Sequence, residues 1–224
     1  MVHEQQQTDV DVSALITEGR LAIEREAQGV AAVAAQLDES FTEAVRMLYT
    51  VRGRVFVTGA GTSGAIARRM AHLLAVCGTP AMFIHAADAL HGTMGAVIEG
   101  DVVIAISRGG SSREINDFCV RVKERGAEVI ALTADPDSEF AGIADAVVTL
   151  TSPLEVDPGE VIAMGSTLVT AVWGDALAYV LMRMRGYGWE SILHTHPSGA
   201  VGLISDAPVA LAPLSSPWKE RDEE

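Results

Sequence analysis

Cysteine, aromatic residues and positive charge are all scarce in this chain of 224 residues. The two cysteines, Cys77 and Cys119, form no metal-type pair and fit a reducing compartment. Aromatic residues make up 5% of the chain, whereas hydrophobic residues make up 49%. The core must therefore be built mainly from Ala, Val, Ile, Leu and Met, a composition that suits buried parallel strands packed on helices.

The shortage of positive charge excludes one class of partner. The chain has 16 Lys and Arg residues against 30 Asp and Glu residues, which gives a formal net charge of -14. Such acidity argues against binding the phosphate backbone of DNA or RNA. An anionic small molecule would have to be bound by a local device, because the overall charge repels it.

Targeting and membrane segments are not evident in the sequence. The first ten residues are polar and lack the basic and apolar stretches of a signal peptide. No apolar run approaches the roughly 20 residues of a membrane span. We therefore expect a soluble cytoplasmic protein with no membrane partner.

Short β-branched runs alternate with helical patterns along most of the chain. The runs expected to form strands are 54–58, 81–85, 102–107, 128–133 and 146–150. The segments expected to form helices are 12–48 with a break near 38–40, 65–76, 115–125 and 162–185. This alternation predicts an α/β fold, a doubly wound five-stranded parallel sheet of flavodoxin-like type with N-terminal helices.

The domain organisation follows from the same pass along the chain. Residues 1–10 are expected to be a leader, residues 11–204 a single domain, and residues 205–224 a proline-rich acidic tail. Within the domain, the segment 186–202 is expected to be a loop.

Two loops rich in glycine and hydroxyl groups are expected where strands give way to helices. They read Gly-Ala-Gly-Thr-Ser-Gly at 59–64 and Ser-Arg-Gly-Gly-Ser-Ser at 107–112. In a doubly wound sheet, ligands bind at the carboxyl ends of the strands, where backbone N–H groups and helix dipoles favour an anion. The two loops predict an anion-binding site, although the glycines could serve tight turns alone.

The first loop also matches the dinucleotide fingerprint G-x-G-x-x-G. That fingerprint needs an acidic residue near the end of the next strand, but this strand ends in His85, and Asp88 lies beyond it. The second loop has no role in a dinucleotide fold. A phosphate monoester therefore fits the pair of loops better than NAD does.

Several segments together resemble a known family. They are 57–64, 78–92, 101–107, 174–178 and 196–202. In this order they are similar to the SIS (sugar isomerase) family, in particular its arabinose-5-phosphate isomerase branch, over roughly residues 15–204. Members of that branch often carry paired CBS domains after this point, and this chain resembles a member without them.

The resemblance implies a phosphosugar aldose–ketose isomerase that works through an enediol and needs no metal or other cofactor. Hydroxyl groups of both loops would bind the phosphate of the sugar. By position, the family's hydroxyl groups match Ser63, Ser107 and Ser112, with Thr62 and Ser111 beside them. Gly61 and Arg108 complete the set of candidate phosphate-binding residues. The spacing of His85 and His91 could indicate a metal site, but no third ligand lies nearby with zinc-like spacing.

The resemblance also implies the catalytic residues. His196 matches a family histidine that reaches the active site of a neighbouring subunit, which implies a homodimer or homotetramer with shared active sites. Glu155 matches a catalytic glutamate, and Glu160 is close enough to compete for that role. His91 is a further candidate for lining the site.

Two departures from the family pattern leave alternatives open. The branch usually has a lysine where this chain has Thr62, and a glutamate where it has Ser111. Arg108 either restores the positive charge or is a solvated arginine paired with an acid such as Glu114. The alternative function is a non-catalytic SIS domain that senses a sugar phosphate, and a third reading is an isomerase for a different sugar.

Overall fold

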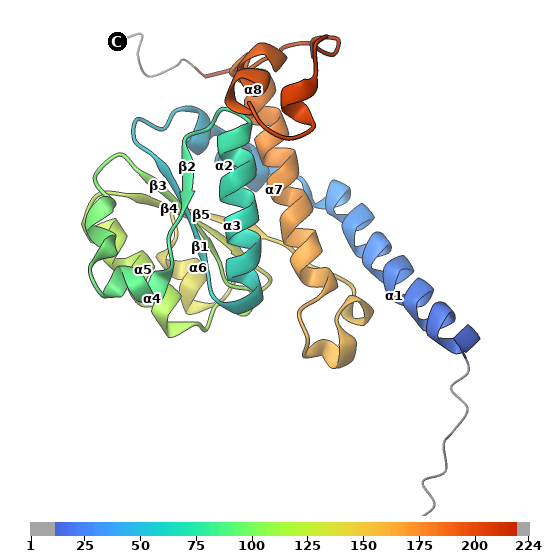
Figure 1. Ribbon diagram of the computed structural model, residues 1–224. Coiled ribbons are helices and arrows are strands. Elements are labelled where there is room, and N and C mark those ends of the chain that lie inside the picture. The colour runs from blue at the N-terminus through green and yellow to red at the C-terminus, as the bar shows by residue number, and fades with distance from the viewer. Residues whose placement is uncertain (1–11, 219–224) are drawn as a thin grey trace, which may run out of the picture.

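Five parallel strands form the centre of the structure, a computed structural model that describes residues 12–218 (Figure 1). The strands are β1 (Val55–Gly59), β2 (Ala81–Phe83), β3 (Val102–Ile106), β4 (Glu128–Thr133) and β5 (Ala146–Thr149). Their order in the sheet is β2-β1-β3-β4-β5, and every neighbouring pair is parallel. This confirms the predicted doubly wound sheet. The expected leader and the last six residues lie outside the described residues.

Helices cover both faces of the sheet. The α-helices are α1 (Val12–Ala32), α2 (Glu39–Tyr49), α3 (Gly61–Val76), α4 (Ala86–Leu90), α5 (Arg113–Glu124), α6 (Glu139–Ile143), α7 (Gly165–Met184) and α8 (Trp189–Thr195). Short 3-10 turns are η1 (Val33–Gln36), η2 (Thr93–Ala96), η3 (Leu154–Val156), η4 (Pro158–Glu160) and η5 (Val201–Leu203). The first α-helix projects from the domain at its N-terminal end (Figure 1).

Local capping explains where two of these helices begin. Asp38 precedes α2, and its carboxylate accepts hydrogen bonds from the backbone N–H and the hydroxyl of Ser40, at 2.8 and 2.6 Å. The predicted break between the N-terminal helices is confirmed at this residue. Ser138 caps α6 by accepting a hydrogen bond from the N–H of Ala141.

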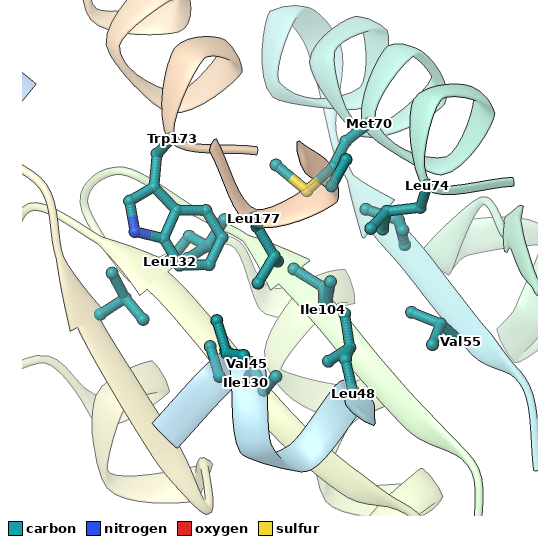
Figure 2. Packing of buried hydrophobic residues seen from close by; sticks show 14 of the residues in the cluster. Val45, Leu48, Val55, Met70, Leu74, Ile104, Ile130, Leu132, Trp173 and Leu177 are labelled. Carbon is teal, nitrogen blue, oxygen red and sulfur yellow. The ribbon is translucent and has the colours of Figure 1, made fainter. Parts of the chain in front are cut away.

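The core divides into two layers because successive strand residues point to opposite faces of the sheet. Val55 and Val57 of β1 face the layer formed with α2, α3 and α7, whereas Phe56 faces the layer with α5 and α6. In the first layer, Trp173 and Leu177 of α7 lie over the sheet (Figure 2).

Helix α7 contains the most apolar stretch of the chain and corrects the expectation that no apolar run approaches the length of a membrane span. It is 20 residues long and, by length and composition alone, apolar enough to cross a membrane. However, 56% of its most apolar window is buried, where it packs against α1, α2 and α3. Its apolarity is therefore explained by its place in the core.

An ion pair also joins α3 to α7. Arg69 of α3 binds Asp175 of α7 through both guanidinium Nη atoms, at 2.5 and 2.9 Å.

The segment 186–202 differs from the expected loop. Residues Trp189–Thr195 form α8, and a 3-10 turn follows at Val201–Leu203. The C-terminal arm then returns to these helices: Trp189 Nε1 donates to the Val209 carbonyl at 3.0 Å, and Arg183 Nε donates to the Ala212 carbonyl at 2.8 Å. These contacts fix the arm beside the C-terminal end of α7.

Candidate functional site

The strand order places the two glycine-rich loops side by side. The order β2-β1-β3-β4-β5 reverses direction between β1 and β3, and the two loops follow these two strands. At such a switch point the helices leave on opposite faces, which opens a crevice outside the carboxyl ends of the strands. The loops lie where a ligand binds in this class of fold.

The first loop is more compact than its sequence indicates, because residues from Gly61 onward already belong to α3. A methyl group added at Gly64 would lie 2.7 Å from the Gly59 carbonyl oxygen, so the absence of side chains lets α3 pack directly on β1. Gly61 has a φ of 55°, which favours glycine. This packing brings Ser63 to the site, whereas Thr62 is exposed.

The second loop combines a buried and an exposed part. Ser107 is 5% exposed, and its N–H donates to the Leu132 carbonyl at 3.0 Å, which continues the β3–β4 ladder. The Arg108 carbonyl accepts hydrogen bonds from Ala134 N–H and from the Thr133 hydroxyl, at 2.8 and 3.0 Å. The backbone of this loop is thus held firmly on β4. Ser111 and Ser112 follow it, at the N-terminus of α5.

A pocket lies between the ends of β3 and β4 and the first turns of α3 and α7. Its apolar floor includes Ile106 and Leu132, and most of its polar lining consists of hydroxyl groups. The hydroxyl-bearing residues are Ser63, Thr133, Ser152, Ser166, Thr167 and Thr170. Only Ser63 among these was singled out from the sequence. The other five could not be recognised from the sequence because they are scattered over a strand, a loop and a helix.

Arg108 is the charged residue of this pocket, and its partner was not foreseen. Its Nη1 donates to Asp157 Oδ2 at 2.7 Å, so the acid paired with Arg108 is Asp157 rather than Glu114. The side chain of Asp157 is fully buried, whereas that of Arg108 is 42% exposed. Asp157 stands eight residues before the start of α7, too far away for the capping pattern that a sequence shows, so no local signal could have found this pair.

The other oxygen of Asp157 binds the start of α7. Oδ1 accepts hydrogen bonds from Met164 N–H at 2.8 Å and from Ser166 N–H at 3.0 Å. Burial raises the pKa of Asp157, but the Ser166 and Met164 hydrogen bonds and the charge of Arg108 outweigh this and lower the pKa overall. The Ser166 hydroxyl also contributes to this lowering, although it stands outside hydrogen-bond geometry. Asp157 is therefore an ionised, buried link.

The candidate bases lie near this link but not in the pocket lining. Glu155 and Glu160 flank Asp157 on the turns η3 and η4, and both are exposed. Glu160 has a φ of 59°, an uncommon conformation for a residue other than glycine. His91 ends α4, which follows β2, and it is also exposed. All three lie toward the carboxyl edge of the sheet.

His196 lies at the other end of the domain. It ends α8, which follows the C-terminal end of α7, whereas the pocket is at the N-terminal end of α7 (Figure 1). A helix of this length spans about 30 Å. Nδ1 of His196 lies 2.7 Å from the Ile192 carbonyl, and a carbonyl can only accept, so Nδ1 carries a proton and Nε2 is unprotonated in the neutral ring.

The described residues, 12–218, do not form a metal centre. Within that range, no three side chains of His, Cys, Asp or Glu gather closely enough to hold a metal ion. His85 Nδ1 lies 4.0 Å from Asp88 Oδ2, which is a loose contact between two exposed side chains. The pocket offers hydroxyl groups and a guanidinium instead, which are groups that bind an oxyanion.

The fold and pocket define a doubly wound α/β domain with an oxyanion-type pocket at its switch point. Comparison with known proteins gives the family: the SIS domain model matches residues 47–179, and the chain belongs to this family. Arabinose 5-phosphate isomerase KdsD of Pseudomonas aeruginosa is 37% identical over 182 residues, which cover 81% of this chain and 55% of that protein. GutQ of Escherichia coli K12, also an arabinose 5-phosphate isomerase, is 34% identical over 84% of this chain and 59% of its own length. The chain thus spans somewhat more than half the length of these relatives.

A solved structure matches over its whole length. It is a protein of Escherichia coli CFT073 in complex with arabinose 5-phosphate, with 30% identity and a TM-score of 0.80, and the match covers 84% of this chain and 100% of that one. A Listeria monocytogenes structure described as a candidate sugar-phosphate isomerase has a TM-score of 0.81 at 29% identity, covering 84% of this chain and 99% of that one.

Proposed function

We propose that this protein is a cytoplasmic phosphosugar aldose–ketose isomerase of the arabinose 5-phosphate isomerase type. The observation that carries the proposal is the hydroxyl-lined pocket, which takes Ser63 and Arg108 from the two loops that carry the family resemblance. The similarity to arabinose 5-phosphate isomerases and to a protein solved with arabinose 5-phosphate supports this substrate class. Free thiols at Cys77 and Cys119 agree with a reducing compartment.

The phosphate of the sugar binds, in this proposal, between the two loops. The N-termini of α3 and α5 direct backbone N–H groups toward it, and the loop hydroxyls add hydrogen bonds. The proposed phosphate-binding residues are Gly61, Thr62, Ser63, Ser107, Arg108, Ser111 and Ser112. The first turn of α3 contains no acidic residue, which leaves its dipole available for an anion.

Isomerisation requires a proton shuttle but no change in the overall number of electrons. A base removes the proton from C2 of the open-chain aldose, the electron pair forms the C1=C2 enediol, and O1 takes up a proton. The enediol then loses the proton on O2 and gains one at C1, which yields the ketose. Glu155 or Glu160 acts as the base, and His91 lines the same edge. Hydroxyl groups stabilise the developing negative charge on the oxygen.

His196 supports this chemistry from a neighbouring copy of the chain. Its place at the far end of α7 keeps it from the pocket of its own chain, whereas its unprotonated Nε2 can accept the proton of the O1 hydroxyl when the sugar ring opens. Exposed apolar residues on the projecting part of α1, among them Leu15 and Ile23, support a subunit contact. The proposed assembly is a homodimer or homotetramer with shared active sites.

The decisive experiment follows the C–H bonds of the substrate. Purified protein is incubated in D₂O with arabinose 5-phosphate and a panel of pentose and hexose phosphates, and proton NMR is recorded over time. Formation of the ketose, with deuterium at C1 of the ketose or at C2 of the aldose, is the expected result. Binding of a sugar phosphate without exchange or turnover would replace the proposal by the sensor function, which the missing lysine and glutamate at Thr62 and Ser111 would then explain.

Mixing of variants tests the shared site. His196→Gln and Arg108→Gln are each expected to lower turnover strongly when assayed alone. If His196 serves the pocket of a neighbouring subunit, mixed oligomers regain part of the activity, because some pockets then contain both intact residues. Activity of the mixture no greater than the sum of the two variants, in oligomers shown by mass to be mixed, would contradict the sharing of His196 between subunits.

A further inference from the structure

The pocket at the switch point must attract an anion although the whole chain is strongly acidic. The formal net charge is -14, so a phosphate needs a nearby cation to overcome long-range repulsion. Among the described residues that line the pocket, Arg108 is the one charged side chain. From the first loop the pocket lining includes Ser63, which carries no charge. Any charge-assisted binding in the pocket therefore depends on Arg108.

An arginine on an exposed loop would ordinarily lose several degrees of freedom when it binds a ligand. Here its position is already fixed at one nitrogen, because Nη1 donates to Asp157 Oδ2 at 2.7 Å. Within residues 12–218, the Arg108 side chain makes only this hydrogen bond, so its Nε and Nη2 still have N–H groups to donate to a ligand. The 42% exposure of the side chain shows that a ligand can reach it.

Asp157 is itself held rigidly. Its Oδ1 accepts the N–H groups of Met164 and Ser166, and its side chain is fully buried. A buried carboxylate is strongly destabilising when its partner is removed, so the pair with Arg108 resists opening. The residue thereby joins the second loop to the segment that carries Glu155 and Glu160 and to the first turn of α7.

A second feature points to a ligand at the same place. The Ser166 hydroxyl lines the pocket, the residue is 8% exposed, and this oxygen makes no hydrogen bond within residues 12–218. A buried hydroxyl of this kind usually has a partner. It adjoins the N-terminus of α7, where an oxyanion is favoured.

We propose that Asp157 is a positioning residue that fixes the Arg108 guanidinium at the pocket, where its remaining donors bind the phosphate group of the ligand in place of a first-loop cation. The proposal deepens the proposed function and rests on it for the identity of the sugar. The positioning itself concerns phosphate binding and does not require turnover. Lysine cannot replace Arg108 fully, because it lacks the planar fork that holds the aspartate and the phosphate at once.

Phosphate binding by defined variants tests the proposal. The affinity for inorganic phosphate is measured by calorimetry and by thermal shift, against potassium chloride at equal ionic strength. Arg108→Gln and Asp157→Asn are both expected to weaken binding by about tenfold or more, since each disturbs a charge-assisted hydrogen bond. The double variant should bind no more weakly than Arg108→Gln alone, because the two residues act as one unit.

Matched controls separate positioning from general destabilisation. Like Asp157, Asp145 pairs with a cation and accepts a backbone hydrogen bond: its partners are Lys123 at 2.8 Å and the N–H of Val129. It directly precedes β5, however, and so lies at the amino end of the strands, away from the pocket. Asp145→Asn should leave phosphate affinity unchanged. Arg108→Lys keeps the buried carboxylate paired and should fold, yet it should bind phosphate more weakly. If Arg108→Gln or Asp157→Asn fails to fold, the phosphate affinities of the double variant and of Arg108→Lys test the proposal instead.

The outcomes are distinct from those of the isomerase test. Wild-type protein that does not bind phosphate, or Arg108 variants that bind it as tightly as wild type, would overturn the proposal. Loss of binding in Arg108→Gln with unchanged binding in Asp157→Asn would overturn the positioning role. Binding that depends on both residues, in a protein that turns over no sugar phosphate, would sustain this inference and remove the isomerase function.

Discussion

The close contact between β1 and α3 makes Gly64 intolerant of even a methyl group. The added Cβ would lie 2.7 Å from the Gly59 carbonyl oxygen and 3.3 Å from its carbonyl carbon, and backbone atoms cannot rotate away. In an open helix, Ala is favoured over Gly by about 1 kcal/mol. Overpacking costs typically about 1–3 kcal/mol, and a clash with backbone atoms belongs to the upper half of this range, about 2–3 kcal/mol, which outweighs the gain. We expect Gly64→Ala to be destabilised by about 1–2 kcal/mol.

Thermal and urea unfolding measure this effect, with Gly19→Ala as the matched control. Gly19 also lies in a helix, α1, but a methyl group added there would meet no atom within 4 Å. For a protein of this size, 1 kcal/mol corresponds to a Tm change of about 2–4 °C. Gly64→Ala should therefore melt several degrees below wild type, whereas Gly19→Ala should melt at the same temperature or slightly higher.

The same substitution has a functional consequence. Ser63 precedes Gly64 and lines the pocket, so displacement of the first turn of α3 should also weaken phosphate binding. A Gly64→Ala protein that is as stable as wild type would refute the reasoning, because it would mean that β1 and α3 are not packed as closely as described.

Three further predictions concern other contacts. The Arg69–Asp175 pair is about half exposed, so Asp175→Asn should lower the free energy of unfolding by about 1 kcal/mol or less, and a double-mutant cycle in urea checks the coupling. The pKa of Asp157 is lower in the folded chain than its ordinary value of 3.8, so the ionised form stabilises the fold above that pH and this stability declines as the pH falls through the folded-state pKa. Asp157→Asn should therefore lose stability less steeply than wild type as the pH falls below about 4, whereas an equal slope in acid unfolding would contradict the assignment. Burial raises the pKa of the Cys119 thiol to about 12, so a thiol reagent such as DTNB should modify it only after unfolding, and rapid modification in the native state would exclude the buried position.

Most of the fold was predictable because it depends on local patterns. Runs such as 102–107 are β-branched and apolar on both faces, which is typical of buried parallel strands, and Asp38 and Ser138 carry recognisable capping signals. The prediction of a loop at 186–202 was wrong because it also relied on local patterns. The segment 186–202 looked like a loop because Gly186, Gly188 and Pro197 punctuate it, yet α8 forms between them and its Trp189 is held by a hydrogen bond to the C-terminal arm.

The sequence by itself determined that two hydroxyl-rich loops lie at one edge of a parallel sheet, because parallel strands present all their carboxyl ends there. Only the tertiary structure decided what surrounds them. Arg108 and Asp157 are 49 residues apart, and an ion pair at that separation depends on how α7 is placed against the sheet. The structure likewise separates His196 from the pocket by the length of α7, a distance that motif spacing in a chain cannot express.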